Sequence, residues 1–255
     1  MDVATDPHQR LIDDLLGFGD LKVWSVLVTI FGDLAPASGA YVPGPFLTAL
    51  TTELGIKPEA QRVALHRLRK DGWIEAKKDG RVSLYALSAL ARRETRSVQS
   101  RIFDARVARP GKVHLIVVEP GRERDAPGDW LPVAAGVYLS DSAPEGARAP
   151  LVSSVDVTAL PDWVRRAAMA EETQVNYRAL TDLLSQDIGL PAGPPEKALA
   201  LRLLILHRWR RLVLSHSRPA AHVMGPGWIG NACRGEVQRW LSDLPRPARA
   251  EIEAH

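Results

Sequence analysis

Residues 58–87, PEAQRVALHRLRKDGWIEAKKDGRVSLYAL, carry the most specific structural pattern in this sequence. The first half of the stretch predicts a helix over 58–71, because at about 100° per residue its small and apolar side chains gather on one side. That side consists of Gln61, Ala64, Leu65, Leu68 and Gly72. The other side carries Arg62, His66 and Arg69, with Glu59 and Lys70 at its edges. We therefore expect an amphipathic helix with one basic face.

A β-hairpin is predicted directly after Gly72. The first strand begins at Trp73-Ile74, Asp79-Gly80 is a tight turn, and Val82 to Tyr85 forms the return strand. Three cations, Lys77, Lys78 and Arg81, flank the turn. A helix that can lie in the DNA major groove, followed by a β wing with cations at its tip, is typical of a winged helix-turn-helix.

The candidate DNA-binding residues are basic side chains of this stretch other than Arg67, which lies off the main polar face: Arg62, His66, Arg69, Lys70, Lys77, Lys78 and Arg81. We expect Arg62, His66 and Arg69 to reach base edges, since arginine bidentate to guanine is the commonest specific contact. The hairpin cations suit phosphates or the minor groove, where they add salt-dependent affinity rather than specificity. The alternative is that the helix cations only cover a solvated surface, and the cationic hairpin beside them favours DNA.

Charge is concentrated in this region. The chain has 255 residues, 45% hydrophobic and 25% charged, which is typical of a globular protein with up to three small domains. The formal net charge is +3, while residues 57–81 alone hold eight basic and four acidic residues. The surplus is thus local, and the rest of the chain is near neutral.

The sequence also indicates the cellular compartment. A single cysteine rules out an internal disulfide and fits a reducing cytoplasm. The N-terminus lacks the order of a signal peptide, and no run of about 18 apolar residues exists that would span a membrane. We expect a cytoplasmic protein without a membrane segment.

The whole chain is predicted as an α+β multidomain protein. Its expected parts are an N-terminal arm or short helix at 1–20, a winged-helix domain at 21–87, a linker helix at 88–103, a small α+β domain at 104–160 and a helical domain at 161–255. The α+β domain rests on three expected strands at 112–119, 133–139 and 151–157.

The C-terminal part of the sequence contains no convincing nucleotide-binding, metal-binding or catalytic motif. GPGWIG at 225–230 fits the G-x-G-x-x-G pattern, but no βαβ unit surrounds it, so we expect a turn against which Trp228 packs. The spacing of His216, His222 and Cys233 is too irregular for a zinc site. No nucleophile, base and orienting group occur at recognisable spacing. We expect no enzyme activity, no metal and no cofactor, and a final polar segment at 245–255 that is frayed.

Several motifs together resemble the PaaX family of bacterial transcriptional regulators, named for the repressor of phenylacetic acid catabolism. They are LVTIFGDL at 27–34, the run formed by Arg62, Arg67, Leu68, Gly72 and Trp73, the hairpin ending Tyr85-x-Leu87-Ser88, GVYLS at 136–140, the LLILHRWRRLVL helix, and Gly227-Trp228-x-Gly230. The resemblance covers about residues 20–245.

The resemblance implies three parts: a winged helix, a central ferredoxin-like domain similar to CRISPR-associated endoribonucleases, and a helical C-terminal domain. It also implies a homodimeric repressor that releases double-stranded operator DNA on binding an aryl- or acyl-CoA thioester, typically phenylacetyl-CoA. The sequence departs from the family at 120–132, which shows no helical pattern where the family has a helix.

The candidate effector-binding residues are His207, Arg208, Arg211 and Trp228. His207 and Arg211 share a helix face at i, i+4, and an acyl-CoA needs cations for its phosphates. The alternative is a structural helix with a charged edge. Two other functions remain open for the protein: a metal-dependent nuclease using the central domain, and a winged helix that binds protein instead of DNA.

Overall fold

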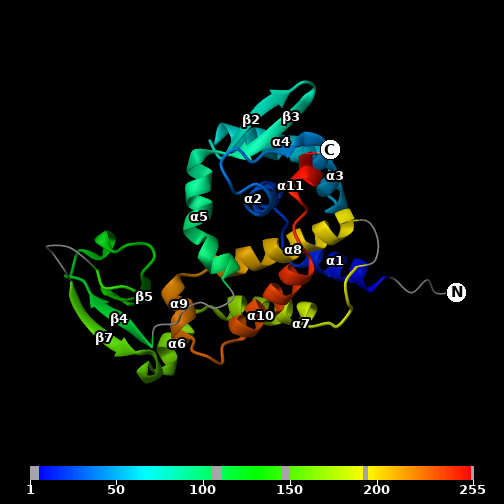
Figure 1. The fold of residues 1–255 in the computed structure, drawn as a ribbon. Helices are drawn as coiled ribbons and strands as arrows, with labels where there is room; N and C mark the ends of the chain where they lie inside the picture. The colour runs from blue at the N-terminus through cyan, green and yellow to red at the C-terminus, as the bar shows by residue number, and fades with distance from the viewer. Residues whose placement is uncertain (1–5, 105–110, 145–149, 192–194, 254–255) are drawn as a thin grey trace. The chain divides into compact units, whose positions relative to one another are not determined.

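Two small antiparallel sheets and eleven α-helices make up the described part of the chain, a mixed α+β structure (Figure 1). The structure is a computed structural model that describes residues 6–104, 111–144, 150–191 and 195–253. Two compact units form: one from residues 1–104, 183–211 and 236–255, the other from 105–182 and 212–235. The α+β class is thereby confirmed, and the five-part division stays a prediction.

The first unit begins with a short helix rather than a loose arm. Helix α1 (Pro7–Gly17) buries Leu11, Ile12 and Leu15, so an arm without structure over 1–20 is the wrong alternative. Residues 1–5 of that expected arm lie outside the described part.

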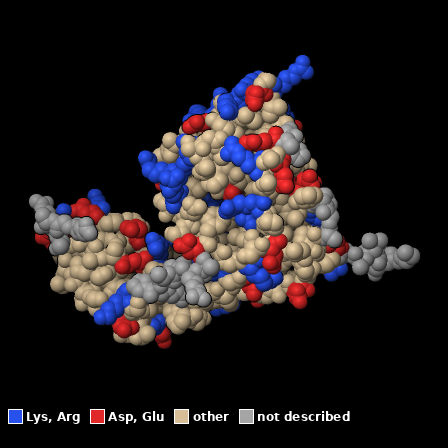
Figure 2. All heavy atoms as spheres, viewed as in Figure 1, with Lys and Arg blue, Asp and Glu red and all other residues tan. Residues whose placement is uncertain are grey.

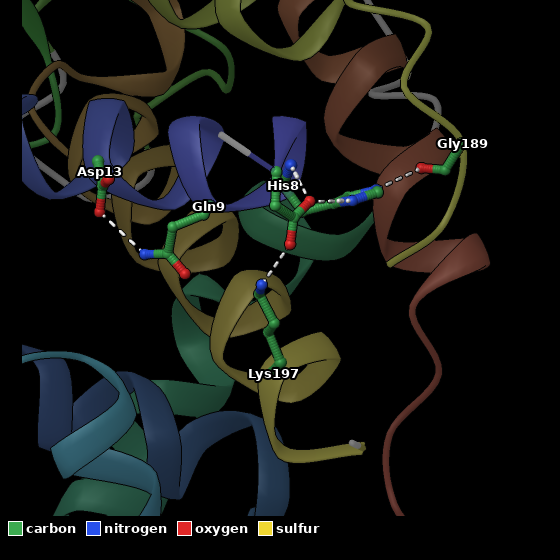
Figure 3. Close-up of polar contacts among 6 residues, drawn as sticks. His8, Gln9, Asp13, Gly189 and Lys197 are labelled. Atoms are coloured by element: carbon green, nitrogen blue, oxygen red, sulfur yellow. Dashed lines mark hydrogen bonds and ion pairs between the residues drawn. The ribbon is translucent and has the colours of Figure 1, made fainter. Parts of the chain in front are cut away.

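Asp6 fixes the start of α1. Its carboxylate accepts the His8 backbone N–H at 3.0 Å, and Lys197 Nζ lies 2.5 Å from its other oxygen. His8 Nδ1 lies 3.2 Å from Asp6 Oδ1, and Figure 3 shows the other side of the His8 ring facing the Gly189 carbonyl, which lies 3.2 Å from His8 Nε2. The bond from Lys197, followed by the His8 N–H, lowers the pKa of Asp6 to about 2. The carboxylate therefore stays charged at the positive end of the helix dipole.

Four helices and one sheet complete the N-terminal segment of this unit. The helices are α2 (Val23–Leu34), α3 (Gly44–Glu53), α4 (Pro58–Lys70) and α5 (Ala89–Phe103). The sheet contains β1 (Val42–Pro43), β2 (Ile74–Asp79) and β3 (Val82–Leu87) in the order β1-β3-β2. Asp79 pairs with Val82, so Gly80 (φ +56°) and Arg81 form a two-residue hairpin turn.

The helix expected over 88–103 is present as α5, and its role as a linker between domains stays a prediction. Ser88 caps α5, its Oγ accepting the Ala91 N–H at 3.1 Å.

Helix α8 (Pro195–Val213) supplies the centre of the first unit with its residues up to 211. Leu201, Leu204, Ile205 and Trp209 are buried, as the apolar pattern predicts. The indole N–H of Trp209 donates to the Ile102 carbonyl at 2.8 Å.

The polar C-terminal segment is ordered where frayed chain was expected. Helix α11 (Arg249–Glu253) buries Ile252, and Arg249 Nη2 donates to the Gly39 carbonyl at 3.0 Å. The expectation of fraying is therefore wrong for residues 249–253, because one apolar side chain and one arginine hold the segment. Residues 254–255 lie outside the described part.

The second unit contains a four-stranded antiparallel sheet. Its strands are β4 (Lys112–Val117), β5 (Leu131–Ala134), β6 (Val137–Ser140) and β7 (Leu151–Asp156), in the order β5-β6-β4-β7. The single strand expected over 133–139 is wrong, since Gly136 (φ +68°) turns the chain and divides it into β5 and β6.

Short helical elements accompany this sheet: η1 (Glu123–Asp125), η2 (Val157–Ala159), α6 (Asp162–Ala168) and α9 (Arg218–Val223). Helices α7 (Glu171–Leu184) and α10 (Ile229–Asp243) complete the list. The 3₁₀ turn η1 is the only helical element within 120–132, in agreement with the missing helical pattern, and the last two residues of the segment begin β5.

Candidate nucleic-acid interface

Helix α4 is held against α3 by its buried face. Ala64, Leu65 and Leu68 are buried there, and so is the polar Gln61. Thr51 Oγ1 donates to Gln61 Oε1 at 2.6 Å, and Gln61 Nε2 donates to Thr48 Oγ1 at 3.2 Å. Because its amide is hydrogen-bonded at both ends, Gln61 is a satisfied buried polar group that fixes α4 on α3.

The outward face of α4 carries the predicted cations. Arg62, His66, Arg69 and Lys70 are all exposed. Arg62 Nη2 donates to Glu59 Oε1 at 2.9 Å, which lays the guanidinium along the N-terminal half of the helix.

Sequence reasoning missed the centre of this outward face. Opposite the buried residues, at about 100° per residue, lie Glu59, Val63, His66 and Lys70, whereas Arg62 and Arg69 lie to one side. Val63 is 70% exposed and is the apolar member of the row. Its spacing of four from Glu59 could have located it, but only charge was considered on that face.

The corner between α4 and the hairpin is a Schellman motif. Trp73 N–H donates to the Leu68 carbonyl at 2.8 Å and Gly72 N–H to the Arg69 carbonyl at 3.1 Å, with Gly72 at φ +72°. Ser88 then binds both corner residues, its Oγ donating to the Gly72 carbonyl at 2.6 Å and its N–H to the Trp73 carbonyl at 2.9 Å. The helix end and the base of the hairpin are thereby fixed together.

The hairpin presents the remaining predicted cations. Lys77, Lys78 and Arg81 are exposed, and Figure 2 shows Lys and Arg side chains along the hairpin and at its tip. Lys77 Nζ lies 3.9 Å from the ring centroid of Tyr41, a cation–π contact that positions the ammonium. Tyr41 lies in the loop before β1, and nothing in the sequence pattern pointed to it.

The candidate effector residues of α8 have internal partners. Arg208 is buried and donates to the Leu15 and Leu16 carbonyls at 2.7 and 2.9 Å, which neutralises the C-terminal end of α1. Burial, followed by the nearby Arg211, lowers the pKa of Arg208 to about 10. Arg211 is exposed and donates to the Asp20 carbonyl.

His207 is also buried, with Nδ1 3.1 Å from Thr29 Oγ1. That hydroxyl donates to the Ser25 carbonyl at 3.1 Å and accepts from Arg210 Nε at 3.1 Å, so His207 donates from Nδ1. Burial first, and then the charge of Arg210, lower the pKa of His207 to about 3. The imidazole is therefore neutral.

Trp228 belongs to the second unit. Its ring lies edge-on to Tyr177 at 5.0 Å between centroids and occupies the space where a Cβ on Gly230 would sit, 2.5 Å from the nearest ring atom. Trp228 N–H donates to the Gly225 carbonyl at 3.4 Å, and Gly225 has φ +78°. The expected turn at 225–230 with a packed tryptophan is confirmed.

A cavity of about 1030 Å³ opens in the second unit beside Val118, Arg122 and Trp130. The cavity is not lined by the candidate effector residues His207, Arg208, Arg211 and Trp228.

Within the described residues there is no group of three His, Cys, Asp or Glu side chains that could hold a metal ion. No helix in the described part of the chain is long and apolar enough to cross a membrane.

Residues 22–91, which contain α2 to α4 and the hairpin, match the family model described as PaaX-like protein. The resemblance to the PaaX family is confirmed. The chain is 26% identical over 243 residues to the transcriptional repressor PaaX of Escherichia coli, an alignment that covers 82% of this chain and 76% of the relative.

A solved structure, the uncharacterized protein Rv0674 from Mycobacterium tuberculosis, is similar with a TM-score of 0.53 and 20% identity. The structural alignment covers 92% of this chain and 97% of the Rv0674 chain. The match to the PaaX-like family model thus lies on the candidate interface, and the solved structure shares the fold.

Proposed function

We propose that this protein is a sequence-specific DNA-binding transcriptional regulator whose α2–α4 and β2–β3 form a winged helix-turn-helix. One observation carries the proposal: the exposed basic face of α4 is joined at a fixed corner to a hairpin with Lys77, Lys78 and Arg81 exposed. This arrangement places a helix suited to the major groove beside cations suited to the flanking backbone.

The two parts of the interface have different tasks. The N-terminal half of α4, with Arg62 and His66, contacts base edges, where arginine recognises guanine. Arg69 and Lys70, at the end nearer the hairpin, and the hairpin cations contact phosphates. Specificity therefore comes from the start of α4 and most of the salt-dependent affinity from its end and the hairpin.

Repression is the proposed sign of regulation, supported by the name of the Escherichia coli relative, a transcriptional repressor. That name also agrees with the expectation of a regulator rather than an enzyme. A homodimer would place two α4 helices on half-sites about one helical turn apart. An aryl- or acyl-CoA effector would favour a dimer geometry that no longer matches those half-sites.

The effector residues proposed from the sequence differ in whether their side chains are exposed to a ligand. Arg211 is the exposed cation of the α8 set and remains the candidate for a CoA phosphate. His207 and Arg208 would act through the packing of α8, since their side chains are buried against α2 and α1.

We also propose that the sheet of the second unit is a reduced ferredoxin-like domain. If β4, β5, β6 and β7 are numbered 1 to 4 along the chain, their order across the sheet is 2-3-1-4, which is the ferredoxin-like order. All neighbouring strands are antiparallel. The first crossover carries η1 in place of the usual helix.

Selection from a pool of randomised DNA duplexes tests the regulatory function. The purified full-length protein should enrich one motif, present twice at about one helical turn if the protein binds as a dimer. Enrichment of no sequence would contradict the proposal. Cleavage of the duplex with Mg²⁺ would instead support the nuclease alternative.

A further inference from the structure

Val63 stands out on the outward face of α4. It is 70% exposed, more than any other large apolar side chain of the described first unit. A valine here gains nothing from the fold: its side chain is not packed, and a β-branched residue is a poorer helix former than the alanine that would fit equally well. Single exposed apolar residues are common on protein surfaces, so the exposure of Val63 alone does not indicate a function. The residues around Val63 indicate whether it contacts a ligand.

Those neighbours are the proposed base-contacting residues. Val63 follows Arg62 directly and lies one turn before His66 and one turn after Glu59, within the first six residues of α4. The N-terminal part of a recognition helix is the part that faces base edges in the major groove. An apolar side chain in the middle of that row faces a groove whose one apolar feature is the thymine C5-methyl group.

We infer that Val63 contacts a thymine methyl group and so specifies thymine at one position of each half-site, an inference that rests on the proposed function. The two valine methyls exclude water from the thymine methyl. The polar groups of Glu59, Arg62 and His66 on either side recognise the adjacent base edges.

The test uses the full-length protein and duplexes that it selects from a randomised pool. Each thymine of the selected motif is replaced singly by deoxyuridine, which removes only the methyl group. One replacement per half-site should weaken binding about 3- to 10-fold, the range expected for losing one buried methyl contact. Val63→Ala should bind the thymine and deoxyuridine duplexes within about twofold of one another, since alanine reaches less far.

Val175→Ala is the matched control, because Val175 is a half-exposed valine on α7 in the other unit. It should keep the full preference for thymine. Equal binding of every deoxyuridine duplex by the wild type, or an unchanged thymine preference in Val63→Ala, would overturn the inference and leave sequence-specific binding intact. Selection of no motif would overturn the proposed function, and the inference with it.

Discussion

Arg202 and Asp33 form a bidentate ion pair at the centre of the first unit, with Nε 2.7 Å from Oδ2 and Nη2 3.0 Å from Oδ1. Both side chains are buried, at 5% and 0% exposure. Arg202 Nη1 also donates to the Leu241 and Leu244 carbonyls at 2.8 and 2.6 Å. Since Asp33 lies in the last turn of α2, the helix that packs on α4, this pair connects the C-terminal helices to the element that supports the candidate interface.

Replacing Asp33 by Asn should destabilise the protein by about 3–5 kcal/mol, because Arg202 is left buried without its counter-charge. Urea unfolding monitored by circular dichroism measures the change. Glu59→Gln is the control: it breaks the exposed pair with Arg62 and should cost less than about 1 kcal/mol. Similar losses in the two variants would show that the Asp33 pair is not buried as described.

Gly230 and Gly235 form a matched pair within α10. A Cβ at Gly230 would lie 2.5 Å from the Trp228 ring, so Gly230→Ala should destabilise by about 1–3 kcal/mol. A Cβ at Gly235 meets nothing within 4 Å, so Gly235→Ala should stabilise by up to about 1 kcal/mol. Thermal unfolding of both variants checks the opposite signs. Two changes of the same sign would contradict the packing of Trp228 on Gly230.

Acid should weaken the fold through His207. Above pH about 6.5 the imidazole is neutral in both the folded and the unfolded state. Between pH about 6.5 and the folded-state pKa of about 3, the imidazole is protonated in the unfolded chain but stays neutral in the folded protein. The free energy of unfolding should therefore fall by about 1.4 kcal/mol per pH unit from this group as the pH drops below 6.

His207→Asn isolates that contribution, because its amide can still donate to Thr29 but does not titrate. Its unfolding free energy should decline less steeply between pH 6 and 5 than that of the wild type. Parallel pH profiles for the two proteins would mean that His207 is not held neutral.

The hairpin cations should control salt dependence rather than base preference. Combined Lys77→Ala, Lys78→Ala and Arg81→Ala should reduce the slope of log affinity against log salt by about 2–3, at about 0.9 per lost phosphate contact. Affinities for the selected duplex over a range of salt concentrations give the slope, and a second selection gives the motif. An unchanged slope would place the phosphate contacts elsewhere.

Local patterns of the sequence predicted the candidate interface well. The helical period of 58–70 and the turn residues at Gly72 and Gly80 act over a few residues, so the helix, corner and hairpin could be located without the rest of the chain. The helix expected over 88–103 and found as α5 has the same local origin.

Contacts between distant segments could not be predicted in this way. Nothing near Arg202 or Arg208 in the sequence indicates that one binds Asp33 and the other the end of α1. The division of 133–139 at Gly136 was missed for a different reason, because a glycine inside an apolar run fits a strand as well as a turn. Val63 was missed because charge alone was used to define the outward face of α4.

The affinity of α4 variants for the selected duplex tests the central claim most directly. Arg62→Ala with Arg69→Ala is compared with the wild type at one moderate salt concentration, and Arg166→Ala with Arg178→Ala, exposed arginines of the other unit, is the equal-charge control. We predict a loss of about 10-fold or more for the α4 variant, because Arg62 loses a base contact, roughly 1–3 kcal/mol, and Arg69 loses a phosphate contact in addition, and a change within about twofold for the control. Equal affinities of the wild type and the α4 variant would contradict the assignment of α4 as the helix that recognises DNA.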